Sequence, residues 1–407
     1  TFTDLRNATS ITESSRIYIL KETPKGDFEI TFGNGTVLGV SPVAGNKVTV
    51  DYLSCKGASA NGGKSFTPVS QINVNGVNYT VSSTTVSNSF GGSAKESIAS
   101  IRTTAPFQYA TQNRMVTAED YATLTQRNFG SLLNDISSFG GEDALKPEFG
   151  VIFLSLLFSD AIENDTISGE TIKQTTKDDI VALAKDLSVA SFDVKFTDPV
   201  QTFVETSVFF QFNPNLTTLA ENAIKSQVQD VVNNYFSKNT GKFKQSFRRS
   251  NLLTLIDAVS PSILSSRCTV GMQQRITPTL TAISDYTLRL PQSIATADDV
   301  NRIVTSTAFT FQNKNCIIRN RLNSNVLEVF DNVNSEIVVD NIGSYTGDTI
   351  SIIGLQIDAI PTGESFIKIT ATPENQSFVT PFRQDVLKHD LQRSLVSVVE
   401  VSTDVLN

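Results

Sequence analysis

Hydrophobic and polar residues alternate with a period of two along the first part of the chain. The alternation is clearest in three short runs at residues 16–20, 28–32 and 47–53. Successive side chains of a strand point to opposite faces, so this period is typical of half-buried strands. Gly33-Asn34-Gly35 follows the second run with residues that tolerate positive φ, which predicts a hairpin there.

A second pair of strand-like runs, residues 71–74 and 77–81, surrounds Asn75-Gly76. This dipeptide is the strongest short-range hairpin signal in the chain. Residues 58–65 just before it fit a relaxed phosphate-loop pattern that includes Lys64. A phosphate loop must open a helix, whereas residues 66–69 continue as an extended segment. Nucleotide binding by Lys64 is therefore the less favoured interpretation.

In the middle of the chain the hydrophobic period changes to three or four residues. Residues 216–236 are the best example, with apolar side chains on one face and polar ones on the other, which predicts a helix packed on its own core. The surrounding order resembles a split β-α-β-β-α-β layer, with helices over one face of a sheet. Its other elements are predicted as strands at 151–158, 192–196, 202–212 and 263–276 and helices at 178–188 and 251–259.

After residue 277 the alternation of strands returns, and residues 382–401 fit a helix and a strand equally well. We therefore predict an α+β multidomain protein. Its parts are a strand-rich N-terminal domain at 1–115, an α+β middle domain at 116–280 and a β-rich C-terminal domain at 281–407, with a hinge at 277–284. The C-terminal strands are predicted at 286–290, 307–321, 326–330, 336–339 and 365–371.

Charge and length narrow the classes of partner. The 407 residues carry a net charge of -8 and no long basic run, which argues against nucleic acid. The longest apolar run has eight residues, far below the roughly 20 of a membrane helix. Charged residues make up only 18%, so Ser, Thr and Asn cover the exterior, a composition that suits protein contacts and fits an ordinary β-rich soluble protein equally well.

The cysteines predict the compartment in which the chain is made, and the N-terminal residues predict whether it is part of a longer protein. Cys55, Cys268 and Cys316 are far apart and odd in number, which predicts reduced, buried thiols and synthesis in a cytoplasm. The chain begins with neither Met nor a signal pattern, so we expect a piece of a longer protein.

Candidate catalytic and metal-binding groups are few. His389 is the only histidine, and neither a nucleophile elbow nor a zinc-ligand spacing accompanies it, so we interpret it as a surface residue. Paired carboxylates could suggest a glycosidase, with Glu142 as one acid. Three of the pairs, however, follow a threonine in the same way, which predicts helix starts at 117–120, 176–179 and 296–299. We predict no catalytic, cofactor or metal site.

Residues 90–121 join a Gly-Gly turn, two predicted helix starts and a break before Pro106, and we interpret them as a domain junction. The module resembles the signature of the baseplate J-like family of contractile phage tails and related injection machines. Further on, the 326–330 and 342–345 stretches resemble the large wedge proteins of T-even-type phages. The residues that carry the family signature are Gly91, Gly92, Glu96, Arg102, Pro106, Arg114, Thr117, Asp120 and Tyr121.

The resemblance implies a structural role without enzymatic activity or cofactor. It implies a virion protein, made in the bacterial cytoplasm, that joins a contractile tail baseplate wedge. Its partners would be itself, in dimer and ring contacts around the tail hub, and other wedge proteins, without membrane insertion. The alternative is a tail protein that binds host-surface carbohydrate through its C-terminal domain, although the chain has no Trp to stack on sugars.

Overall fold

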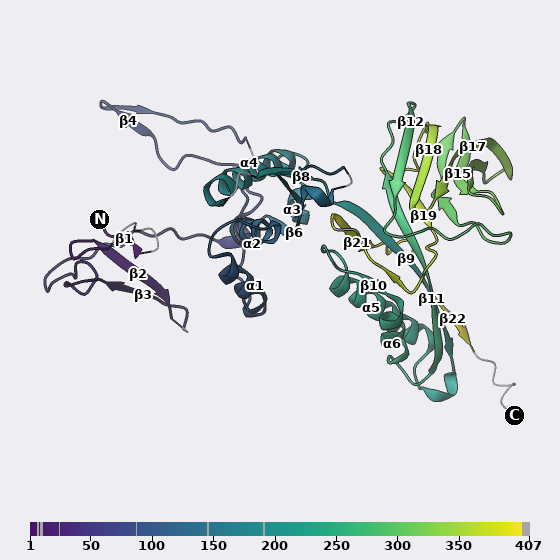
Figure 1. Cartoon of the computed structure of the whole chain (residues 1–407), viewed down its shortest axis with the longest axis horizontal. Helices are drawn as coiled ribbons and strands as arrows, with labels where there is room; N and C mark the ends of the chain where they lie inside the picture. Colours follow the sequence, from purple (N-terminus) through teal and green to yellow (C-terminus); the bar gives the residue numbers. More distant parts are fainter. Residues whose placement is uncertain are drawn as a thin grey trace. The chain divides into compact units, whose positions relative to one another are not determined.

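The computed structural model describes residues 1–5, 8, 11–23, 25–86, 88–144, 146–189 and 192–400. It confirms the α+β class, since helices accompany several separate sheets (Figure 1). The chain divides into two compact units, Thr1–Lys56 and Gly57–Asn407. The predicted domain boundaries, at 115/116 and 280/281, do not coincide with this division after Lys56, and they stay predictions.

The first unit holds a small sheet of β1 (Thr3–Asp4), β2 (Ile17–Glu22) and β3 (Phe28–Phe32). β1 lies parallel to β2, and β2 pairs antiparallel with β3, as the alternation at 16–20 and 28–32 predicts. The predicted hairpin at 33–35 and the strand at 47–53 are wrong. Asn34 Oδ1 instead accepts the backbone N–H groups of residues 36, 37 and 38 at 2.9–3.0 Å, a side-chain turn that replaces strand pairing.

The second unit begins with the hairpin of β4 (Ile72–Val74) and β5 (Val77–Tyr79). Asn75 and Gly76 between them both have positive φ, 52° and 83°, which confirms the predicted turn. Residues 57–60 form only one turn of 3-10 helix, and residues 63–68 after it belong to neither a helix nor a strand. Lys64 thus lies outside any helix start.

A compact α/β region follows and contains β6 (Leu133–Gly140), β7 (Val151–Phe158) and β8 (Asp193–Thr197) in one sheet. β6 is antiparallel to β7, and β7 is parallel to β8, so the crossover helix α4 connects the parallel pair. Buried side chains of α2, β7 and α4 share one core. The helices of this region are α1 (Ile98–Thr111), α2 (Ala118–Phe129), α3 (Asp160–Glu163) and α4 (Gly169–Leu187).

All the remaining described strands except the short β10 and β20 form one large sheet, in the order β12-β18-β17-β16-β15-β13-β19-β11-β9-β21. β14 pairs with β15, and β22 pairs with β9. The strands are β9 (Val200–Phe212), β11 (Ile263–Ile276), β12 (Ile283–Arg289), β13 (Val304–Ser306), β14 (Phe309–Phe311), β15 (Lys314–Asn320), β16 (Val326–Asp331), β17 (Glu336–Thr346), β18 (Thr349–Gln356), β19 (Ile367–Ala371), β21 (Asp385–His389) and β22 (Leu395–Glu400).

Helices α5 (Glu221–Asn239) and α6 (Arg249–Asp257) pack on the β9 and β11 part of this sheet, and the short pair β10 (Phe247–Arg248) and β20 (Phe378–Val379) lies beside them. α5 begins five residues later than predicted, because Pro214 opens a separate turn of 3-10 helix at Pro214–Leu216. The exposed Leu216 and Leu219 therefore precede the helix.

The predicted order of elements in the middle region is correct, but the single layer is wrong. β7 and β8 belong to the three-stranded sheet with β6, whereas β9 and β11 belong to the large sheet. The chain passes between them through Asp198-Pro199. Proline cannot donate to a ladder, so it suits a point where a strand changes partners. The ambiguous 382–401 segment provides two strands, β21 and β22, both parallel to β9.

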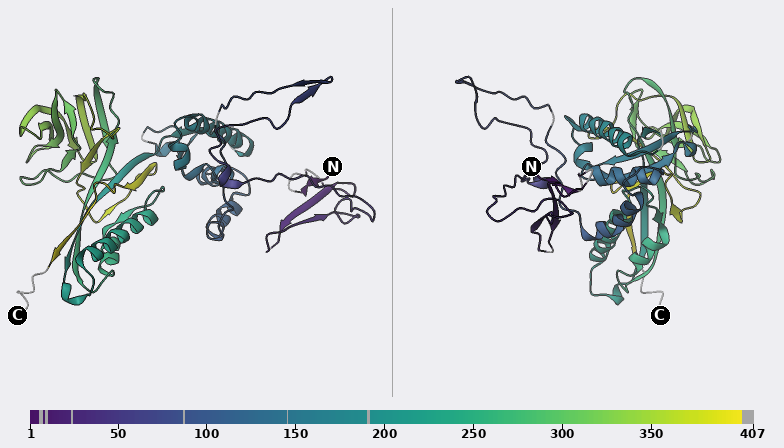
Figure 2. Two further views of the ribbon diagram at one scale, coloured as in Figure 1. Left: turned by 180° about the vertical axis from the view of Figure 1, so that it is seen from behind. Right: turned by 60° about the vertical axis from the view of Figure 1, so that its left-hand side comes forward.

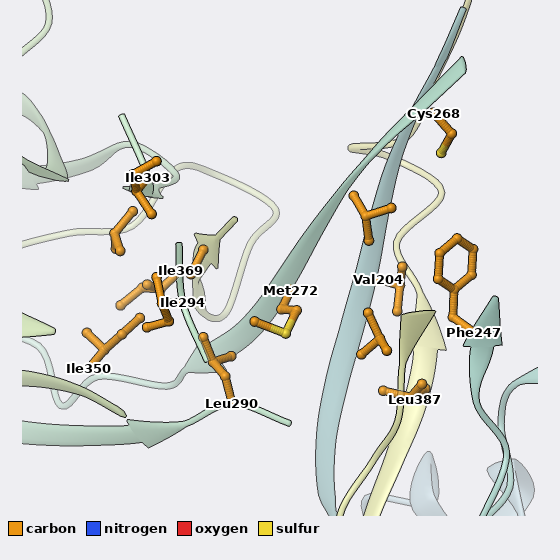
Figure 3. Packing of buried hydrophobic residues seen from close by; sticks show 14 of the residues in the cluster. Val204, Phe247, Cys268, Met272, Leu290, Ile294, Ile303, Ile350, Ile369 and Leu387 are labelled. Atoms are coloured by element: carbon orange, nitrogen blue, oxygen red, sulfur yellow. The ribbon is translucent and has the colours of Figure 1, made fainter. Parts of the chain in front are cut away.

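Buried aliphatic and aromatic side chains fill the interior of the large sheet and its helices, and Figure 3 shows part of this core. Cys268 and Cys316 are free and buried there, as predicted. Burial raises the pKa of the Cys268 thiol to about 12, so this thiol is unreactive. Cys55 departs from the prediction, because it is exposed and lies outside the strands.

Candidate functional surfaces

Thr117, Asp120 and Tyr121 form the start of α2. The Thr117 hydroxyl accepts the Asp120 N–H at 3.3 Å, and the Asp120 carboxylate accepts the Thr117 N–H at 2.8 Å. This reciprocal capping box confirms the predicted helix start. Tyr121, next in the chain, is fully buried, and burial raises its pKa. The three residues therefore have a structural role in seating α2 on its sheet.

Gly91, Gly92 and Glu96 precede α1. Gly91 has a φ of +86°, a conformation that favours glycine. Gly92 exchanges two hydrogen bonds with the Asn61 amide, at 2.8 and 2.9 Å, and a Cβ on Gly92 would lie 2.2 Å from the Gly57 carbonyl oxygen. The Glu96 carboxylate accepts the Ser100 hydroxyl at 2.7 Å, next to the N-cap Ser97.

Pro106 does not break the chain, contrary to the prediction, because it lies inside α1. α1 packs chiefly on α2 and is otherwise exposed, so the helix can accommodate the missing N–H without disturbing a core. Arg102 is exposed on the same helix, and Arg114 after it donates to the Gln112 amide oxygen at 2.6 Å. Glu96 and Arg114 thus each make a hydrogen bond with a residue close to them in the chain.

The other two predicted helix starts are wrong. Thr176 lies in the interior of α4, where its hydroxyl donates to the Ile172 carbonyl at 2.7 Å. Asp298 lies in a loop, where its carboxylate accepts the N–H of Val300 at 2.8 Å. A threonine followed by a carboxylate can cap a helix, but Asp also forms such local turns by itself.

The remaining candidates for chemistry also take structural positions. His389 is half-buried and not a free surface residue: its ring stacks on Phe236 with centroids 3.7 Å apart, and desolvation lowers its pKa to about 4. The exposed Glu142 folds its carboxylate back over Gly140, where a Cβ would lie only 2.2 Å from it. Across the described ranges, no group of three or more His, Cys, Asp or Glu residues could hold a metal ion. None of the described helices has the length and apolar content to cross a bilayer.

Contacts between the α/β region and the large sheet form a junction that the sequence patterns did not reveal. Leu157, Phe243 and Val386 form a small buried cluster there. Polar contacts surround it: the Ser137 hydroxyl donates to the Arg383 carbonyl at 2.7 Å, and the Phe243 N–H donates to the Asp135 carboxylate at 2.8 Å. Desolvation raises the pKa of Asp135.

A cavity of about 970 Å³ lies at this junction, between Phe139 of β6 and the β9, β12 and β21 strands. Asp385 on its wall is buried, and desolvation raises its pKa to about 6. Arg289, also on the wall, stacks over Phe382 with its guanidinium carbon 4.4 Å from the ring centre. These groups come from segments distant in sequence, so periodicity alone gives no signal for them.

A buried polar network lies nearby, around Asp390 after β21. Its carboxylate accepts from Lys368 at 2.9 Å, from the Gln273 amide at 2.7 Å and from Arg275 at 3.4 Å. Hydrogen bonds and these cations outweigh desolvation and hold its pKa at about 2. The Arg275 guanidinium lies between two aromatic rings, with centroids at 3.4 and 4.4 Å. The network ties β11 and β19 to the chain after β21.

Comparisons with known proteins find similarity to baseplate proteins of contractile tails. Residues 117–195 match the family described as baseplate structural protein gp6, C-terminal domain I, and residues 201–275 match domain III of the same protein. The chain is 26% identical over 283 residues to baseplate wedge protein gp6 of Enterobacteria phage T4, which covers 65% of this chain and 41% of that protein. The chain is a distant homologue of that protein and spans less than half its length.

Among solved structures, a chain of the anti-feeding prophage baseplate, determined by cryo-EM, is similar to this one. The similarity covers 45% of this chain and 39% of that chain, with 14% sequence identity and a TM-score of 0.32. The matches in sequence confirm the resemblance to contractile-tail baseplate proteins. The two matched segments meet at the junction described above, since the domain I match ends within β8 and the domain III match begins in β9.

Proposed function

We propose that this chain is a structural component of the baseplate wedge of a contractile phage tail, that it associates with itself and with other wedge proteins, and that these contacts build a ring around the tail hub. The observation that carries the proposal is the tandem match of residues 117–195 and 201–275 to two domains of one baseplate protein, in the same chain. The wedge protein of phage T4 supplies the role by similarity.

Exposed apolar side chains support a role in assembly. α1 presents Ile98, Phe107 and Tyr109, which are 69%, 55% and 85% exposed. Covering exposed apolar side chains such as these removes apolar area from water, which favours contact with another molecule. A ring subunit needs two distinct contact surfaces, or two self-complementary ones, and a chain of several packed regions can supply them.

Two measurements test the proposal. Light scattering on the purified chain should give a dimer or a larger discrete species, and co-expression with the other wedge proteins of its phage should give a complex that co-purifies. A monomer at every concentration would refute self-association. A chain that binds none of the wedge proteins would refute the wedge assignment.

A further inference from the structure

The β4–β5 hairpin lies at the end of a long extension made of an outgoing and a returning chain segment, here called the arm and defined as residues 64–86 (Figure 1). Figure 2 shows the arm from two further sides. Its base is fixed: the Gly62 N–H donates to the Ser89 carbonyl at 2.8 Å, and the Ser89 N–H donates to the Gly63 carbonyl at 3.0 Å. Asn88 then ties this base to the α3–α4 turn, since its amide donates to Asp165 at 3.0 Å.

The hairpin of the arm has one apolar and one polar face. Ile72 lies opposite Tyr79, and Val74 lies opposite Val77, so these four side chains share a face. Asn73 and Asn78 lie on the other face, where the Asn73 amide donates to the Asn78 side-chain oxygen at 2.6 Å. The apolar face is open, because its four side chains are 49–55% exposed.

The arm carries no charge beyond its base. Residues 65–94 contain no Asp, Glu, Lys or Arg, although the chain as a whole has 74 such residues. Exposed strands are normally protected from association by charged side chains, most often Lys. An exposed hairpin with an apolar face and no charge therefore favours contact with another apolar surface, because a charged partner surface would lose hydration without gaining a counter-charge.

We propose that the apolar face of the arm, Ile72, Val74, Val77 and Tyr79, packs on the same face of the arm of a second copy of this chain. A two-stranded hairpin is marginal alone, whereas two hairpins stacked face to face form a two-layer unit with a buried interior. The face is made of two cross-strand pairs, so a two-fold axis brings apolar side chains onto apolar side chains and charges onto none.

Four half-exposed side chains bury far less area than the roughly 1,200 Å² of a stable complex. The arm contact is therefore weak alone and reinforces another contact between the same copies. The inference rests on the proposed self-association and names one surface that produces it.

The test compares two single substitutions at neighbouring residues of the full chain. Val77→Asp places a carboxylate on the apolar face, and Asn78→Asp places the same charge on the polar face while keeping a hydrogen-bond acceptor. Sedimentation velocity across a wide concentration range should show that Val77→Asp self-associates with at least about tenfold lower affinity than the wild-type chain, because a buried carboxylate would lack a partner. Asn78→Asp should change the affinity by less than about threefold.

Cross-linking provides a second readout that does not depend on a destabilising substitution. In a Cys55→Ser background, which removes the exposed cysteine, Val77→Cys should link two copies through a short bis-maleimide, because stacked sheets lie about 10 Å apart. Asn78→Cys should link far less.

Equal association and equal cross-linking of the two variants would overturn the arm contact while leaving self-association intact. A wild-type chain that is monomeric throughout would overturn both, yet leave the baseplate assignment open to its own test. Cross-linking of Val77→Cys only to a different wedge protein would show that another protein occupies the face, and would also overturn the proposal.

Discussion

Two aspartates of the same strand region show how environment decides the behaviour of identical side chains. Asp385 and Asp390 lie five positions apart, and both are almost fully buried. Asp390 accepts from two cations and an amide, which hold its pKa at about 2. Asp385 has the distant Arg289 and one backbone N–H, so desolvation dominates and raises its pKa to about 6.

Asp385 should therefore weaken the folded state at neutral pH. Because its folded pKa lies above its unfolded value, its contribution to stability is present below about pH 4 and is lost as the pH rises to about 6. Asp385→Asn should raise the free energy of unfolding at pH 7 by about 1–2 kcal/mol, after allowance for water in the adjoining cavity. Urea titrations at pH 4.5 and pH 7 would measure the difference.

The matched control is Asp186→Asn, a substitution of an exposed carboxylate on α4. It should leave both the stability and its pH dependence close to those of the wild type. If Asp385→Asn retains the wild-type loss of stability between pH 4.5 and pH 7, another group causes that loss and the assignment to Asp385 is wrong.

At the scale of elements, the same sequence pattern gave one correct and two incorrect helix starts. Thr117-Ala118-Glu119-Asp120 caps α2, while Thr296-Ala297-Asp298-Asp299 forms a loop. The difference lies in the residues that follow the motif. α2 buries Tyr121 and Leu124 against the β6-β7-β8 sheet, and such packing supplies most helix stability. A capping motif can mark a helix end, but the apolar face that follows decides whether the helix forms.

Thr117→Ala should therefore destabilise the start of α2 by about 1 kcal/mol, because it removes the acceptor for the Asp120 N–H. Hydrogen exchange of the amides of residues 118–121 should become several times faster. Thr296→Ala is the control, since Thr296 is exposed in a loop, and it should change stability by less than about 0.5 kcal/mol. Unchanged exchange in Thr117→Ala would show that packing alone holds the helix end.

At the scale of the whole molecule, local patterns predicted most long strands but not their partners. The alternating and apolar runs identified β7 and β11 with their observed bounds. Periodicity reports which face of a strand is buried, whereas the choice of sheet depends on contacts distant in sequence. The separation of β8 from β9, the junction cavity and the Asp390 network therefore could not be predicted from the sequence. Among the signature residues, Thr117 and Asp120 form the capping box of α2, whereas Pro106 lies inside α1.

The small buried cluster at the junction should hold the two matched regions together. Phe243→Ala would empty the small cluster with Leu157 and Val386, and truncation of a buried Phe costs about 3–5 kcal/mol. We expect faster proteolysis near residues 198–199 and faster hydrogen exchange in β6. Phe149→Ala, which truncates an 85% exposed ring, is the control and should change neither rate. Equal proteolysis of the two variants would show that the polar contacts hold the junction without the cluster.

The central claim is that this chain is a structural part of a contractile-tail baseplate wedge. A cryo-EM reconstruction of the phage tail that carries it tests this claim most directly, because the density can be compared with the fold of residues 117–275. We predict that the β6-β7-β8 sheet with α2 and α4, joined to the β9–β11 pair, fits wedge density around the tail hub in repeated copies. A complete baseplate in which no density accommodates this fold would contradict it.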